Sequence, residues 1–134
     1  MDSPSAVALN GNLVVTWSLI GGDIGTRIFT PGQGWSSPFF NLNGQMGTLT
    51  VAVTDNGNIG VWAYREARGP DVNKIKFAKT SDGVTFNFWK ATNHTSERRP
   101  AVIMADQFSN SLEWSHIGTD GARSVNFTAL PFSP

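Results

Sequence analysis

Acidic residues are the first candidates for catalysis in this sequence, because hydrolysis of a glycosidic bond needs two carboxyl groups roughly 5–10 Å apart. Such a pair can be drawn from distant positions in a chain. Five acidic residues are considered for it, namely Asp23, Glu66, Glu97, Asp106 and Glu113. Glycosidase chemistry is therefore one alternative for the function of this chain.

Other common catalytic constellations do not occur in the sequence. It has no Cys and no Gly-x-Ser-x-Gly motif, so we expect neither thiol nor serine-hydrolase chemistry. His94 and His116 lie far apart and belong to no zinc-type spacing. Aspartates occur singly in turns such as Asp82-Gly83, whereas a calcium loop clusters its oxygen ligands at alternate positions. We expect no metal and no cofactor.

A binding site fits this composition better than an active site. Sugar recognition combines an aromatic face with a few polar or charged side chains that bond to hydroxyl groups, and it needs no perturbed acid. Trp35 and Trp89 stand at equivalent ends of two sequence repeats, where packing between sheets is the alternative role. The predicted ligand-binding residues are Trp35, Trp89, Arg27, Lys74, Tyr64, Glu66 and Arg98.

The charge and hydropathy of the chain argue against some partners. Its 10 Lys plus Arg balance 10 Asp plus Glu, and the basic residues are scattered, so nucleic acid is not an expected partner. Apolar runs are far shorter than the ~18 residues of a membrane span, so we expect no membrane association. No export signal is visible, which leaves the localisation open between the cytoplasm and non-classical release.

Three stretches of the chain repeat one order of elements: a short apolar strand, a polar turn, and a second strand that ends at a tryptophan. These tryptophans are Trp17, Trp62 and Trp114. Their spacing is close to the ~40–50 residues of a four-stranded propeller blade. A third strand, opened by a basic residue, follows in each unit. We predict a single domain of three β repeats, over about residues 4–43, 44–94 and 95–134.

The apolar residues within these stretches alternate with a period of two, and glycines are too frequent for long helices. Asn-Gly pairs such as Asn10-Gly11 favour tight hairpins. We expect the segment 64–68 to be a loop, because Gly69-Pro70 stops it. The predicted fold is all-β and propeller-like, with about three four-stranded blades; a β-sandwich or a small barrel is the alternative. Since a closed propeller uses ~4–8 blades, we predict that self-association, as a homodimer or a higher ring, completes it.

The segment Thr80-Ser81-Asp82-Gly83-Val84-Thr85-Phe86 resembles the Asp-box of sialidase-type propellers. The box of that family has one residue between its Asp and its Gly, whereas Asp82 and Gly83 are adjacent. The resemblance implies a structural role for Asp82, which would tie down its hairpin through backbone N–H groups. The stretch Gly32-Gln33-Gly34-Trp35 is similar to the glycine-then-tryptophan turns of small propeller lectins.

Sialidases use a tyrosine nucleophile activated by a glutamate, and three arginines that grip the substrate carboxylate. The resemblance would assign the first pair to Tyr64 and Glu66, and Arg98 lies in a stretch similar to the Arg-x-Pro entry of the first sialidase blade. The preferred function is carbohydrate binding by a multivalent, lectin-like module with glycans in pockets between blades. A propeller-type protein-interaction scaffold and a sialidase-like glycosidase are the alternatives.

Overall fold

The computed structural model describes residues 4–53, 57–96, 98–106, 111–118 and 122–129. These residues form β-strands and no helix, as the all-β prediction expects. The strands are β1 (Ser5–Leu9), β2 (Asn12–Ser18), β3 (Ile24–Thr30), β4 (Gly34–Trp35), β5 (Phe39–Asn41), β6 (Met46–Val53), β7 (Gly60–Glu66), β8 (Lys74–Thr80), β9 (Asn87–Thr95), β10 (Ala101–Asp106), β11 (Ser111–Ile117) and β12 (Arg123–Ala129).

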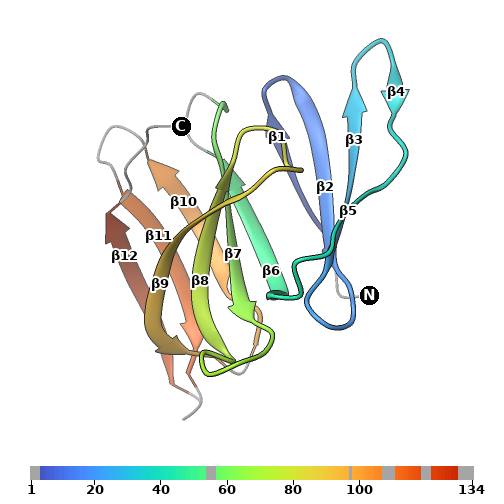
Figure 1. The fold of residues 1–134 in the computed structure, drawn as a ribbon. Coiled ribbons are helices and arrows are strands. Elements are labelled where there is room, and N and C mark those ends of the chain that lie inside the picture. The colour runs from blue at the N-terminus through green and yellow to red at the C-terminus, as the bar shows by residue number, and fades with distance from the viewer. Residues whose placement is uncertain (1–3, 54–56, 97, 107–110, 119–121, 130–134) are drawn as a thin grey trace.

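The strands form three antiparallel sheets, each built from consecutive parts of the chain (Figure 1). The first has the order β1-β2-β3-β4, with the short β5 also paired to β3. The second has the order β6-β7-β8-β9, and the third β10-β11-β12. None of these sheets closes into a barrel over the described residues, which does not match the small-barrel alternative.

Alternation of side chains explains the first hairpin. Leu13 is exposed and Val14 is buried, as expected where one face of a strand packs against a core. The loop between β1 and β2 is Asn10-Gly11, and both residues have positive φ, 51° and 79°. Asn and Gly tolerate that conformation better than other residues, so this pair fixes the hairpin.

Two apolar cores hold the sheets together. The first lies between the first and second sheets and includes Leu9, Val14 and Trp62, and the second lies between the second and third sheets around Phe77 and Trp114. Because successive side chains of β7 point to opposite faces, this strand supplies residues to both cores. The first strands also contact one another in order, β6 lying against β1 and against β10.

The turn after β8 connects two sheets. The carboxylate Oδ1 of Asp82 accepts hydrogen bonds from the backbone N–H groups of Val84 and Thr85, each at 2.8 Å. Asp82 thus holds its hairpin through backbone N–H groups, as the resemblance in the sequence implies. The carbonyl oxygen of Gly83 accepts a bond of 3.2 Å from the buried Thr26 hydroxyl of the first sheet. The turn therefore fixes both its own shape and the position of the neighbouring sheet.

Candidate functional site

β7 extends further than the sequence predicts, and this brings several charged residues together. The expected loop at 64–68 is wrong in its first half, because β7 continues to Glu66, which pairs with β6, and its pairing with β8 reaches Arg65. Tyr64 and Glu66 therefore alternate with Arg65 and share one face of the second sheet. Tyr64 lies directly opposite Lys76 of β8. All three side chains are on the face that packs against the first sheet.

A chain of ion pairs runs along this face. Lys76 Nζ lies 3.1 Å from Glu66 Oε2 and 3.0 Å from Asp71 Oδ2. Lys74 Nζ lies 3.0 Å from the other oxygen of Asp71. Hydrogen bonds from Lys74 and then Lys76 lower the pKa of the Asp71 carboxyl. Burial alone would lower the pKa of Lys76, but its bonds to Asp71 and Glu66 outweigh burial and raise it. Lys76 stays charged and links the two carboxylates.

Tyr64 is almost fully buried beside this chain, at 2% exposed. Burial, and then the negative charge of Glu66, raise the pKa of the Tyr64 phenol far above its usual range. The phenol therefore keeps its proton at neutral pH. Its ring meets the half-exposed ring of Phe88 edge to face, with centroids 6.2 Å apart. Tyr64 therefore lines a pocket beside Phe88 as a protonated phenol.

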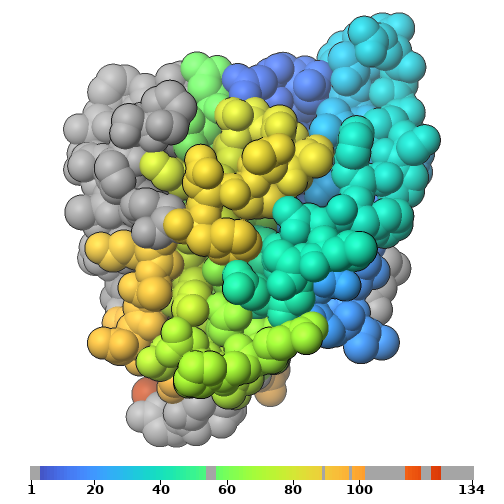
Figure 2. Space-filling view, in the orientation of Figure 1, coloured from blue at the N-terminus to red at the C-terminus, as the bar shows by residue number. Residues whose placement is uncertain are grey.

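Two adjoining pockets open over these side chains. The first, of about 280 Å³, is bounded by Tyr64, Phe88 and Lys90, and the second, of about 380 Å³, by Glu66 and Asp71. Gln45 and Lys76 line both pockets. We call the two together the Lys76 groove. Figure 2 shows the segment that follows β5 lying between β9 and the β7–β8 connection at this place.

Hydrogen bonds to backbone groups fix the walls of the Lys76 groove. The Gln45 carbonyl accepts a bond of 2.8 Å from Ala67 N–H, and Gly44 N–H donates to Asp23 Oδ1 at 3.0 Å. The Arg68 guanidinium donates to the Gly21 carbonyl. These bonds join the β5–β6 connection to the β7–β8 connection and to the first sheet. The groove is therefore formed before any ligand arrives.

Arg27 and Trp35 also come together, but outside the Lys76 groove. The Arg27 guanidinium lies 5.4 Å from the centre of the half-exposed Trp35 ring, and Arg27 Nε donates to the Ser36 carbonyl at 3.1 Å. Trp35 pairs with Phe29, which pairs with Leu13. Since the neighbouring Val14 points into the first core, these residues lie on the opposite face of the first sheet.

The remaining predicted residues are dispersed. Lys74 reaches the groove only through its ion pair with Asp71. Arg98 is exposed beyond β9, and its backbone N–H donates to Ser96 Oγ at 3.2 Å. The Trp89 side chain lies outside the described residues.

The predicted set does not include several residues that line the groove, among them Lys76, Asp71, Phe88, Gln45 and Lys90. A signal for Lys76 was present in Lys74-Ile75-Lys76, where the buried Ile75 puts both lysines on one face. Phe88 gave no such signal, because its place beside Tyr64 depends on an irregular pairing of β8 with β9.

No protein-family model and no curated protein matches the chain. Its function is therefore inferred from the geometry of the groove. Over the described residues, no three His, Cys, Asp or Glu side chains gather closely enough to hold a metal ion. The same residues include no helix that is long and apolar enough to cross a membrane.

Proposed function

We propose that this protein binds carbohydrate in the Lys76 groove. The observation that carries the proposal is the placement of a half-exposed aromatic ring, Phe88, beside a fixed chain of paired charges, Glu66, Lys76 and Asp71. An aromatic side chain packs against the C–H face of a sugar ring, while fixed polar groups bond to its hydroxyls.

The charges of the groove suit a neutral ligand with many hydroxyl groups. Carboxylate oxygens of Glu66 and Asp71 can accept hydrogen bonds from hydroxyls, and Lys76, Lys90 and the Gln45 amide can donate to them. Since Lys74 and Lys76 together balance the two carboxylates, a charged ligand gains little extra attraction from these four side chains. The two pocket volumes, about 280 and 380 Å³, are each of the size that holds a small ligand.

Binding is favoured over hydrolysis by the state of the two residues that sialidase chemistry would use. A tyrosine nucleophile needs a phenol that loses its proton readily, and the pKa of Tyr64 is raised instead. The Glu66 carboxylate is held by Lys76 at 3.1 Å, so it is engaged as an ion-pair partner. A sialidase-like glycosidase stays the enzymatic alternative for the test below.

Changing Phe88→Ala should remove the sugar contact and leave the fold, because the ring is half exposed. We expect at least a tenfold weaker response on a glycan array and in titration calorimetry with the glycan that the wild type binds. Ile20→Ala is the control, since Ile20 is 95% exposed in the connection between β2 and β3 and lines neither pocket of the groove.

Hydrolysis of a chromogenic glycoside by the wild type would show an enzyme instead of a binding module. Equal glycan binding by the wild type and by Phe88→Ala would move the site away from the groove. An array on which the wild type binds nothing would favour the third reading, a protein-interaction scaffold. Trp35→Ala, alone and with Trp89→Ala, tests in the same assay whether those tryptophans contact sugar, as the sequence predicts.

We further propose a propeller-like arrangement of the three sheets as the setting of this function. It is supported by sheets built from consecutive strands and by the order of contact of the first strands, β1, β6 and β10. On this proposal the Lys76 groove is a pocket between blades. Several grooves on one assembly would act together on a glycan-coated surface, because the second contact forms at high effective concentration.

A further inference from the structure

Trp17, Trp62 and Trp114 each lie in the second strand of a sheet, in β2, β7 and β11. Trp62 lies in the core between the first and second sheets, and Trp114 in the core between the second and third. Their exposed fractions are 0% and 1%. Each of these two rings therefore points from its own sheet toward the sheet that precedes it in the chain.

Trp17 points the same way, on the outer face of the first sheet. Val14 and Thr16 are buried toward the second sheet, so the alternating Trp17 points away from it. Over the described residues no sheet covers this face. Leu13 and Phe40, which lie on it, are 40% and 58% exposed. In the second and third sheets the face that carries the tryptophan is buried, whereas in the first sheet it is open.

The outer face of the first sheet is almost uncharged. Residues 5–41 include only two charged side chains, Asp23 and Arg27. Asp23 is engaged with Gly44 N–H, and Arg27 lies over the Trp35 ring. A largely apolar face of this kind can pack on another sheet face.

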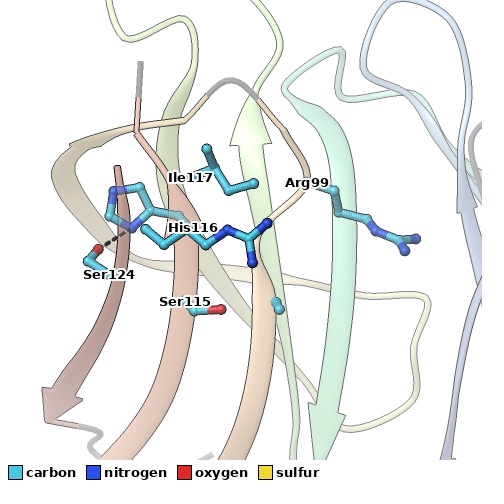
Figure 3. A pocket seen from close by; sticks show the side chains of 7 residues that line it. Arg99, Ser115, His116, Ile117 and Ser124 are labelled. Carbon is cyan, nitrogen blue, oxygen red and sulfur yellow. Dashed lines mark hydrogen bonds between the residues drawn. The ribbon is translucent and has the colours of Figure 1, made fainter. Parts of the chain in front are cut away.

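The third sheet also has an outer face. Trp114 is packed into the second core, so Ser115 and Ile117, Ala101 opposite Ser115, and the exposed Arg123 opposite Ile117 lie on the other face. Small and apolar residues also form the face that receives Trp114, where Val61 and Ala63 are buried. A hollow of about 460 Å³ opens at this end of the third sheet. Figure 3 shows Ser115 and Ile117 between Arg99 on one side and His116 on the other.

We propose that a second copy of this chain packs the outer face of its third sheet against the outer face of the first sheet. Trp17 then lies between two sheets, as Trp62 and Trp114 do. The second copy is inferred from the way sheets pack within one chain. The first sheet leaves open the face that packs on a preceding sheet, and the third has the face that would pack on a following one. This head-to-tail contact does not depend on sugar binding.

The test is the mass in solution, measured by light scattering or sedimentation over a range of concentrations. The wild type should have at least twice the mass of one chain. Leu13→Lys places a charge on the outer face of the first sheet, and Ile117→Lys places one on that of the third. Each variant alone should have the mass of one chain, while a mixture of the two should form a one-to-one pair through the two unchanged faces.

Leu42→Lys is the matched control, because Leu42 is 74% exposed in the β5–β6 connection. It should associate like the wild type. If circular dichroism shows that Ile117→Lys does not fold, Ser115→Arg replaces it on the same face. A wild type with the mass of one chain at every concentration overturns the proposal. So does a folded third-sheet variant that still associates, since that result would mean that two first sheets pack on each other.

Discussion

At the scale of single residues, one carboxylate or ammonium group positions several neighbours. Lys76 holds Glu66 and Asp71 in fixed places, and Asp82 holds the turn after β8. These are charge-assisted bonds, which are stronger than bonds between neutral groups. In both places the residue orients its neighbours, so removing its charge should also loosen the neighbours that it holds.

Replacing Asp82 by Asn should lower the free energy of unfolding by about 1 kcal/mol at neutral pH, since charge-assisted bonds to two backbone N–H groups become neutral ones. Burial alone would raise the pKa of the Asp82 carboxyl, but bonds from Thr85, Val84 and Thr80 lower it below 3.8, its ordinary value. Urea unfolding at neutral pH measures the change.

The sign of the pH dependence follows from that lowered pKa. The folded state binds this proton less tightly than the unfolded state does, so the stabilisation is present above an ordinary carboxyl pKa of about 3.8. It is lost as the pH falls through the lower folded value. Asp82→Asn should therefore lose less stability than the wild type between neutral pH and pH ~3. Equal acid sensitivity of the two proteins would contradict this role.

At the scale of elements, much of the fold follows from local patterns. Period-two alternation predicts β2 and β7, and Asn10-Gly11 predicts the first hairpin, because the information lies within a few neighbouring residues. The end of β7 was missed, since Gly69-Pro70 suggested an early stop while pairing with β8 reaches Arg65 and pairing with β6 carries the strand to Glu66. Tertiary pairing overrides the local signal there.

The candidate site was less predictable than the strands. Tyr64 and Glu66 were named from the sequence, and one face of β7 holds both. Phe88 and Asp71 join them only through the register between neighbouring strands and the course of a loop, which no short stretch of sequence encodes. A site assembled from several elements becomes visible only once their pairing is known.

The turn after β8 gives a prediction at this scale. Gly83 has a φ of +82°, and a Cβ atom at this position would lie 2.6 Å from Val14 Cγ1 in the first sheet. Gly83→Ala should lower the free energy of unfolding by ~1–3 kcal/mol, through backbone strain and through separation of the two sheets. Gly32→Ala is the control, because Gly32 has the same φ and no atom within 4 Å. Thermal unfolding of both variants separates strain from the clash, and equal losses would contradict a clash.

At the scale of the whole molecule, the second sheet joins the other two. Its β7 side chains belong to both cores, so the sheets share one structural unit rather than folding apart. The first core includes Leu9, Met46 and Trp62, and among the described residues Trp114 joins the third sheet to the second core.

Trp114→Ala should weaken the packing of the third sheet on the second. Trp114 meets Phe77 of the second sheet edge to face at 5.3 Å and stacks on His116 at the same separation. Truncation of a buried Trp costs ~3–5 kcal/mol, and here the loss falls on the packing between the second and third sheets. Hydrogen exchange should therefore show β11 amides opening well before those of β2, because the first core is unchanged. Uniform acceleration of exchange in β2 and β11 would mean that the sheets open together, so that β7 couples the cores more strongly than their separate contacts suggest.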